Sequence, residues 1–420
     1  MKRSPLLVIF VTVFIDLIGF GIVIPVLPYY VEGTKFHASA RMVPLLFASY
    51  SVMQVIFTPI LGRLSDKYGR RPILFISLLG TALGFLIMGV AWMLWMLFLG
   101  RIIDGITGGN ISTAQAYIAD ITTPENRAKG MGLIGAAFGL GFIFGPAIGG
   151  ILSKWGIGVP LYFAAGLAFC NAILLYFVLP ETVDKDHPAR VSAATGRWSQ
   201  LVKALNQSRL AFVLSIYFLF IVAFSIMTVS FALFTMYRFG FDATQNGYLF
   251  AMVGVVGAII QGGLIGRLAK RFGEVWLTIT GALLFAFSLF MIPLIGPQTG
   301  LLTFILVGAG FAIGNSLATP SLTSLASKSV GPAEQGGVLG VTQSAASLAR
   351  VVGPGISSLL IYSSVATLGA DGKLHNLSDH SFFATFWTAA AIMFVAFIIA
   401  IYFARSHAAE YASREVAPAS

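Results

Sequence analysis

The stretch LGRLSDKYGRRP, from Leu61 to Pro72, places five charged side chains among twelve residues of a chain that is only 10% charged. A similar stretch, IGRLAKRFGE, begins at Ile265 and has Lys270 where the first copy has Asp66. Each copy follows a long apolar run, and the two GRL segments are 204 positions apart. A charged signature that returns once at this distance indicates that the chain consists of two related halves.

Long apolar runs account for most of the remaining sequence. Hydrophobic residues make up 57% of the 420 residues, too many for a soluble domain with so few charges. Runs of about twenty apolar residues can each cross a bilayer as a helix. We predict twelve such spans with mostly short connections, at residues 5–31, 42–61, 73–92, 94–118, 130–152, 159–179, 210–237, 245–265, 275–295, 299–325, 337–363 and 382–404.

The longest polar stretch, Pro180 to Arg209, separates six predicted spans from the other six. The fifth and eleventh spans share a Gly-Pro pair at one offset, since Gly145 and Pro146 return 208 residues later as Gly353 and Pro354. The sequence therefore predicts an all-α membrane protein with twelve transmembrane helices in two pseudo-symmetric six-helix bundles. The expected divisions are an N-terminal bundle at 1–180, a cytoplasmic linker at 181–209, a C-terminal bundle at 210–405 and a cytoplasmic tail at 406–420.

The distribution of positive charge predicts the orientation of the chain. A net charge of +10 is compatible with nucleic-acid binding, but the Lys and Arg residues are unevenly divided between the two sides of the predicted membrane. With the N-terminus inside, 19 of the 26 fall on inner segments, five on outer loops and two within spans. This bias follows the positive-inside rule, so we expect both termini in the cytoplasm and no nucleic-acid partner.

Five motifs occur in order between residues 16 and 251: DLIGFGIVIPVLP (16–28), GRLSDKYGRRP (62–72), LGRIIDGITGG (99–109), GLGFIFGPAIGG (139–150) and RFGFDATQNGYLFA (238–251). In these motifs the chain resembles the major facilitator superfamily, within it the twelve-helix drug/proton antiporters, and most closely the tetracycline-efflux branch. The resemblance implies a monomeric, multi-pass protein of the bacterial inner (plasma) membrane. It also implies that small amphipathic compounds are exported in exchange for protons by alternating access.

Three ionisable residues inside spans are candidates for proton coupling. Asp16 lies about eleven residues into the first span, near mid-depth at roughly 1.5 Å of rise per residue. A lone carboxyl group in hydrocarbon can take up and release protons, whereas a permanently paired structural carboxylate is the alternative. Arg101 and Asp104 lie three residues apart on one helix face, and the resemblance implies that their span packs beside the first. We expect Asp16 to carry the proton and Arg101 to change partner with its protonation.

The sequence departs from the tetracycline branch at three places. Asp104 stands where that branch usually has a small uncharged residue, and it adds a proton site, binds a cationic substrate or simply neutralises Arg101. The branch also uses an acid in the ninth span and a histidine in the eighth. Here span 275–295 is uncharged, and Gly257 stands where the histidine is expected. Tetracycline is therefore a weak candidate for the substrate.

The opening stretch predicts a gate on the cytoplasmic side. It lies in the loop after the second span, on the side where the eleventh span begins near Gly336. A carboxylate beside a helix N-terminus gains about 0.3–1 kcal/mol, so Asp66 can hold the two halves together there, whereas Lys270 cannot do the same in the second copy. Simple anchoring of the loop among lipid headgroups is the alternative. The expected gate residues are Gly62, Asp66, Gly69, Arg70 and Arg71.

The fifth span carries a stripe of small residues suited to close helix packing. Its glycines recur at four-residue spacing, and a proline bends the helix beside them. The resemblance implies that this is the antiporter motif, whereas the alternative is an ordinary kinked packing helix. The motif residues are Gly141, Gly145, Pro146, Gly149 and Gly150.

Polar residues within spans are candidates for a substrate cavity. Arg350 lies in the middle of the eleventh span and needs a partner, which is a substrate anion, backbone carbonyls or Gln54. The 36 Phe and 12 Met residues can line an adaptable apolar cavity, although most of them will face lipid or other helices. The expected polar lining is Gln54, Asn110, Gln261, Asn315, Gln343 and Arg350.

Two other function classes fit the same architecture. One is a proton symporter or a uniporter for a sugar, an osmolyte or a siderophore-like metabolite, and the other is a non-transporting membrane receptor. An enzyme does not fit, because no predicted span holds a nucleophile–base set or a cluster of metal ligands. We accordingly expect no cofactor and no metal.

Overall fold

Helices that run in alternating directions make up most of the structure. The computed structural model describes residues 5–33, 36–183, 208–330, 335–361, 363–368, 374–377 and 379–406. The first half consists of α1 (Pro5–Glu32), α2 (Met42–Tyr68), α3 (Arg70–Val90), α4 (Leu94–Thr107), α5 (Asn110–Ile121), α6 (Pro124–Leu152), the short η1 (Ser153–Trp155) and α7 (Val159–Val178). The second half consists of α9 (Ser208–Phe239), α10 (Ala243–Ile259), η2 (Ile260–Leu264), α11 (Ile265–Phe272), α12 (Glu274–Met291), η3 (Ile292–Leu294), η4 (Pro297–Thr299), α13 (Gly300–Lys328), α14 (Gln335–Leu360), the antiparallel strands β1 (Ser363–Leu368) and β2 (Leu374–Leu377), and α15 (Asp379–Ser406).

The predicted architecture of twelve membrane crossings in two six-helix bundles is confirmed. Ten helices among the described residues are long and apolar enough to cross a bilayer. The other two crossings are the interrupted pair α4–α5 and the more polar α14, which carries Arg350 in mid-helix. Strands β1 and β2 are a small addition to the predicted all-α fold. The proposed linker falls largely on residues 184–207, and the proposed tail almost entirely on 407–420, both outside the described residues.

Two predicted helices change geometry where glycines are adjacent. The span predicted at 94–118 divides at Gly108 and Gly109. There the N–H of Gly108 bonds to the carbonyl oxygen of Gly105 (3.3 Å), three residues earlier, and not to that of Asp104, as in a regular α-helix. The span predicted at 245–265 contains the π-helical turn η2 and continues as α11. Glycine weakens regular helical structure at both places, and the first break becomes part of the site described below.

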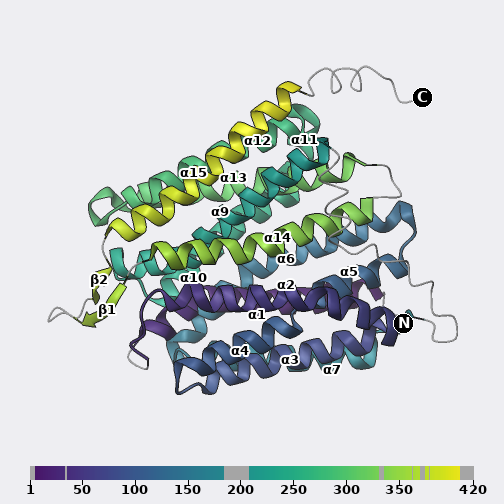
Figure 1. Cartoon of the computed structure of the whole chain (residues 1–420), viewed down its shortest axis with the longest axis horizontal. Coiled ribbons are helices and arrows are strands. Elements are labelled where there is room, and N and C mark those ends of the chain that lie inside the picture. The colour runs from purple at the N-terminus through teal and green to yellow at the C-terminus, as the bar shows by residue number, and fades with distance from the viewer. Residues whose placement is uncertain are drawn as a thin grey trace.

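The two halves lie against each other along their length. In Figure 1, α1 to α7 fill the lower part of the view, and α9 to α15 lie mostly above them. Across the interface α6 packs against α10, and α2 packs against α14, so the fifth span meets the eighth and the second meets the eleventh in two equivalent contacts. Helix α1 begins and α15 ends at one end of the molecule, which we call the terminus side (Figure 1). The opposite end, where β1 and β2 lie, is the loop side.

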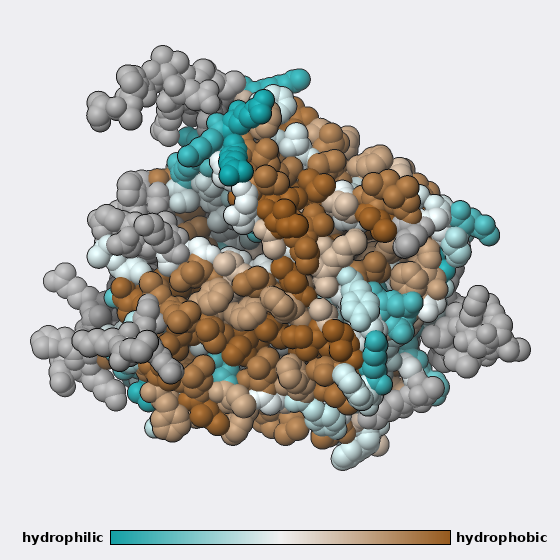
Figure 2. All heavy atoms as spheres, turned by 180° about the vertical axis from the view of Figure 1, so that it is seen from behind, coloured by the Kyte–Doolittle hydropathy of each residue, from teal (hydrophilic) through white to brown (hydrophobic). Residues whose placement is uncertain are grey.

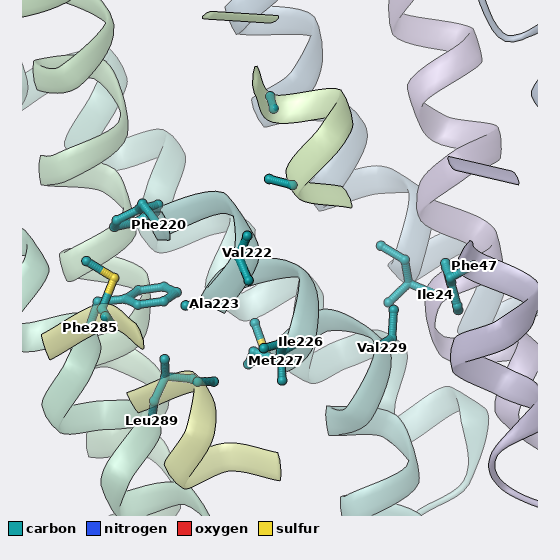
Figure 3. Close-up of a cluster of buried hydrophobic side chains, with 14 of the residues drawn as sticks. Ile24, Phe47, Phe220, Val222, Ala223, Ile226, Met227, Val229, Phe285 and Leu289 are labelled. Atoms are coloured by element: carbon teal, nitrogen blue, oxygen red, sulfur yellow. The ribbon is translucent and has the colours of Figure 1, made fainter. Parts of the chain in front are cut away.

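A shared apolar core joins the halves near the loop side. Figure 3 shows Ile24 of α1 and Phe47 of α2 beside Val229 of α9, within one continuous cluster of buried side chains. In the same cluster the rings of Phe220 on α9 and Phe285 on α12 have centroids 4.7 Å apart. The terminus-side part of the first half has a separate apolar cluster of its own. Apolar packing therefore holds the halves together more firmly at the loop side than at the terminus side.

The outer surface is that of a multi-pass membrane protein. Figure 2 shows apolar residues over the broad middle of the molecule, with hydrophilic residues gathered toward its ends. Exposed tryptophans mark both ends, with Trp92 and Trp155 on the loop side and Trp276 on the terminus side. Tryptophan prefers the boundary between lipid tails and headgroups, so these positions fit a helix bundle that spans a bilayer.

Candidate functional site

A buried ion pair lies inside the first half. Nη1 of Arg101 is 2.9 Å from Oδ2 of Asp104 on the same face of α4, and both side chains are buried. The guanidinium lies over the ring of Tyr50, 4.2 Å from its centroid. Among the described residues, Nε and Nη2 of Arg101 have no hydrogen-bond partner. A charge buried in this way depends on its ion partner, so loss of either side chain leaves the other stranded in an apolar surrounding.

Asp16 of α1 faces this pair. Its carboxyl group lies beside the side-chain amide of Asn110 and is close enough to Asp104 for the two carboxyl groups to interact electrostatically. Asn110 is buried at the start of α5, where its Oδ1 accepts a hydrogen bond from the N–H of Ile111 (2.7 Å). The three predicted coupling residues thus lie together. In this structure Arg101 pairs with Asp104, and no ion pair joins it to Asp16 among the described residues.

A second cation reaches the same region from the other half. The guanidinium carbon of Arg350 on α14 is 5.9 Å from the ring centroid of Phe138 on α6. Arg350 also interacts electrostatically with Tyr50 of α2 and Tyr217 of α9. Tyr50 also interacts electrostatically with Asp16, Arg101 and Asp104. The hydroxyl of Tyr50 therefore lies between ionisable groups of both halves, which sequence patterns give no means to foresee.

A cavity of about 480 Å³ lies between the halves, on the terminus-side part of the interface. Its walls come from α2 and α5 of the first half, with the joint before α5, and from α9 and α14 of the second. The polar groups on these walls are amides and hydroxyls, and the rest of the wall is largely apolar. The polar lining residues are Gln54, Thr58, Ser112, Gln115, Ser215, Gln343, Ser344 and Ser347.

Of the six residues predicted to line the cavity, Gln54 and Gln343 do so. Asn110 lies beside Asp16 instead, and Arg350 lies between the halves. Gln261 and Asn315 are not among the lining residues. Nε2 of Gln261 is 3.5 Å from the hydroxyl of Ser316, and Oδ1 of Asn315 accepts a hydrogen bond from Thr319 (3.1 Å). Sequence reasoning missed the serines and Gln115, because small hydroxyls and single amides are common in helices with no such role.

Hydrogen bonds across the interface close the loop side. The hydroxyl of Tyr237 on α9 donates to Oε2 of Glu32 at the end of α1, and Glu32 is only 3% exposed. The hydroxyl of Tyr29 donates to the carbonyl oxygen of Phe241 (2.7 Å) and accepts from the side-chain amide of Asn246 on α10. These contacts link residues more than 200 positions apart. The only sequence signal for them is Glu32 itself, an acid at the end of an apolar run.

The glycines of the predicted antiporter motif bring helix backbones together. A Cβ atom added at Gly145 would lie 2.6 Å from the Cα of Gly21, and one at Gly149 would lie 2.8 Å from the carbonyl oxygen of Ile22. Gly141 faces α1 in the same way, and Pro146 lies within this run of α6. Gly150 differs from these, because its neighbours are Ala243, Thr244 and Gly247 of α10, in the other half. The motif therefore serves both packing within the first half and contact between the halves.

The charged stretch at the terminus side forms a network on the first half. Nη1 of Arg70 is 2.5 Å from Oδ1 of Asp66, and its Nε is 3.0 Å from Oδ2 of Asp120 on α5. The carboxylate of Glu181 accepts hydrogen bonds from the backbone N–H groups of Arg70 (2.9 Å) and Arg71 (3.1 Å). Glu181 thereby caps the positive end of α3, and the network ties α2, α3, α5 and the segment after α7 together.

Two glycines frame this network. Gly69 has φ +110°, a conformation that other residues adopt only with strain, and it joins α2 to α3. The carbonyl oxygen of Gly62 accepts a hydrogen bond from Ser65 (2.7 Å). The Asp66 side chain is 51% exposed, and residues 331–334, which precede α14, lie outside the described residues. The predicted contact of Asp66 with the helix that contains Gly336 therefore stays a prediction.

Comparison with known proteins identifies relatives along nearly the whole chain. Residues 9–354 and 262–419 match the model of the Major Facilitator Superfamily. The chain is 33% identical to the tetracycline resistance protein, class H, of Pasteurella multocida, with 96% of both sequences covered. It is 30% identical to multidrug resistance protein 2 of Bacillus subtilis (strain 168), with 86% of this chain and 89% of that protein covered.

Solved structures show the same fold at lower identity. The human organic anion transporter MFSD10 (TETRAN) superimposes with a TM-score of 0.69 at 24% identity and covers 95% of this chain and 99% of its own. An inward-facing, unoccupied bacterial homologue of the lysosomal transporter Spinster gives a TM-score of 0.72 at 17% identity and covers 95% and 97%. At these identities the likeness establishes the fold alone.

Proposed function

The chain belongs to the Major Facilitator Superfamily, and we propose that it is a proton-coupled exporter of small amphipathic molecules in the plasma membrane of a bacterium. Its relatives include proteins named for tetracycline resistance and multidrug resistance, and it is a non-enzymatic transporter like them. The observation that carries the proposal is a cavity between the halves, next to a buried cluster of two carboxyl groups and one arginine.

The proposed cycle assigns different tasks to the two ends of the interface. The terminus side, which the charge distribution predicts to be cytoplasmic, has the cavity, and the loop side is closed by the Glu32–Tyr237 and Tyr29–Asn246 contacts. Substrate enters the cavity from the cytoplasm. The loop side then opens while the terminus side closes, and Asp66, Arg70 and their glycines form the proposed gate there. Transport against a gradient requires only that substrate and proton differ in affinity for the two conformations.

Asp16 is the proposed proton carrier. Protonation from outside removes its charge and changes the electrostatic balance with Asp104, which lies beside it and is paired to Arg101. Substrate release outward accompanies this change, and deprotonation inside restores the binding state. Arg350 faces the same region from the second half, so the balance of charge there depends on how closely the halves approach.

Transport in proteoliposomes tests the proposal. The probes are neutral chloramphenicol, cationic ethidium and anionic fluorescein, with vesicles whose lumen is either more acidic or more basic than the medium. An antiporter accumulates its substrate when the lumen is acidic, whereas a symporter does so when the medium is acidic. Accumulation of a probe only under the second condition would show that the exchange direction is wrong, and no saturable flux of any probe would favour a receptor.

A pair of variants tests the role of the carrier. Asp16→Asn abolishes proton-driven accumulation while leaving probe binding intact. Asp242→Asn is the matched control, because Asp242 caps α10 outside the cluster and asparagine caps a helix equally well. If Asp16→Asn still concentrates the probe against a gradient, another residue carries the proton.

A further inference from the structure

We propose that the cavity between α2, α5, α9 and α14 takes an uncharged amphipathic ligand that donates a hydrogen bond to Gln54. The inference rests on the proposed function, since it names the substrate class of the same cavity. It concerns binding alone, however, and its test requires neither a proton gradient nor transport. The charge of the ligand and its hydrogen-bonding group follow from separate features of the cavity wall.

The charge of the ligand follows from the absence of ionisable side chains on the wall. None of the described residues that line the cavity is Asp, Glu, Lys, Arg or His. Of the ionisable residues nearby, Asp104 is paired to Arg101, Asp16 lies beside Asn110, and Arg350 lies over the ring of Phe138 and not on the wall. Transfer of an ionised group from water into such a space costs several kcal/mol unless a partner compensates for it. A ligand in this cavity is therefore uncharged where it contacts the wall.

The hydrogen-bonding group of the ligand follows from the orientation of Gln54. Its Nε2 donates to the hydroxyl of Tyr50 and to the carbonyl oxygen of Gly108, both at 3.0 Å. A carbonyl oxygen can only accept, so the nitrogen must point toward Gly108 and the amide orientation is fixed. Gln54 is 5% exposed, and its Oε1 has no hydrogen-bond partner among the described residues. A buried acceptor left in this state calls for an N–H or O–H donor.

Three of the five hydroxyls on the wall also need a hydrogen-bond donor from the ligand. Ser112 donates to the carbonyl oxygen of Gly109 (2.8 Å), Ser344 to that of Gly340 (3.0 Å) and Ser347 to that of Gln343 (3.0 Å). Each of these hydroxyl hydrogens is thus bonded to a nearby backbone carbonyl, and only the oxygen lone pairs remain for a ligand. These three hydroxyl oxygens and Oε1 of Gln54 are acceptors on the polar side of the cavity, which suits a ligand that carries hydroxyl or amide N–H groups.

The opposite wall sets the shape of the ligand. Leu214, Phe218 and Leu219 of α9 present an apolar surface, and the volume of about 480 Å³ lies within the range of cavities that hold drug-sized molecules. A ligand that meets both walls has an apolar body with donor groups along one edge. Exchange of such a neutral molecule for a proton moves net charge across the membrane, so the proposed transport is driven by membrane potential as well as by the pH difference.

Four ligands that share one biphenyl body test the inference directly. They are 4-phenylphenol (neutral donor), 4-methoxybiphenyl (neutral, no donor), 4-phenylbenzylamine (cationic at pH 7) and biphenyl-4-carboxylate (anionic at pH 7). Binding to the wild-type protein in nanodiscs is measured by titration calorimetry, with empty nanodiscs subtracted. We expect the phenol to bind about tenfold more tightly than its methyl ether, because the ether leaves the Gln54 acceptor unpaired. The two ions bind at least as weakly as the ether.

Two variants assign the donor contact to its residue. In Gln54→Leu the phenol and its ether bind equally, because the buried acceptor is gone. In Gln115→Leu, the matched control on α5 of the same half, the preference for the phenol is kept. Because the wild-type series is informative alone, a Gln54→Leu protein that fails to fold does not remove the test.

Several results would overturn the inference. Equal or tighter binding of the amine or the carboxylate would show that the cavity selects a charged ligand. A preference for the phenol that persists in Gln54→Leu, or that disappears in Gln115→Leu, would place the donor contact elsewhere. Absence of saturable binding by the phenol would remove the assigned class altogether. Failure of the proposed function is a separate outcome, since ligand binding with no proton-driven accumulation refutes the exporter and leaves the cavity assignment standing.

Discussion

Gly150→Ala tests whether the loop side closes through backbone contact between the halves. A Cβ atom at Gly150 would lie 2.9 Å from the carbonyl oxygen of Ala243, 3.0 Å from the Cα of Gly247 and 3.1 Å from the Cα of Thr244. All three atoms belong to the backbone of α10, so no side-chain rotation can relieve the crowding. Overpacking of this kind typically costs about 1–3 kcal/mol.

That cost applies to one conformation only. When the loop side opens, α6 and α10 separate at this point and the added methyl group has room. The substitution therefore shifts the equilibrium toward the loop-side-open state by about 1–3 kcal/mol, or roughly 5- to 150-fold. Alanine is also a better helix former than glycine, so α6 itself is not weakened.

The assay is a distance measurement between spin labels on the two halves. The labels are attached at Lys154→Cys and Gln298→Cys, both exposed on the loop side, after replacement of the exposed Cys170 by alanine. The long-distance population should grow in Gly150→Ala. Gly166→Ala is the matched control, because nothing lies within 4 Å of a Cβ atom there. An unchanged distance distribution in a folded, monodisperse Gly150→Ala protein would refute the reasoning.

Three further predictions concern the polar contacts. Asp104→Asn leaves the Arg101 guanidinium without its ion partner and lowers the free energy of unfolding by about 3–5 kcal/mol. The double variant Arg101→Met/Asp104→Leu is less destabilised, which thermal unfolding in detergent measures. If the losses of the two single changes simply add in the double variant, the prediction is wrong. Tyr237→Phe removes the hydrogen-bond donor to buried Glu32 and favours opening of the loop side by about 1–3 kcal/mol. The same spin labels measure this opening, and an unchanged distance distribution would show that the bond does not contribute to closure. In Arg70→Lys the ammonium cannot bind Asp66 and Asp120 at once. Probe flux in proteoliposomes therefore falls at least tenfold with little change in probe binding. Normal flux would limit the network to a structural role.

The architecture was predictable because membrane helices need long apolar runs, and such runs are visible in any sequence. The ionisable cluster was predictable for a related reason, since Asp16, Arg101 and Asp104 stand out in spans that otherwise avoid charge. Even the pairing of Arg101 with Asp104 agrees with their three-residue spacing on one helix face.

The cavity lining was harder to predict, because helices that are apolar on all sides give no sign of which face turns inward. Gln261 in η2 and Asn315 in α13 are polar residues in such segments, and their orientation depends on packing that the sequence does not reveal. The loop-side contacts depend on the approach of α1 to α9 and α10, across more than 200 residues. No local pattern encodes a meeting of that kind.

The break between α4 and α5 has a mechanical consequence. The side-chain amide of Gln54 donates a hydrogen bond to the carbonyl oxygen of Gly108 at this break, and the same amide is proposed to bind the ligand. Asp104 lies one helical turn before that joint. We therefore expect ligand binding at Gln54 to displace Gly108 and, through the helical turn between them, to shift Asp104 against Arg101.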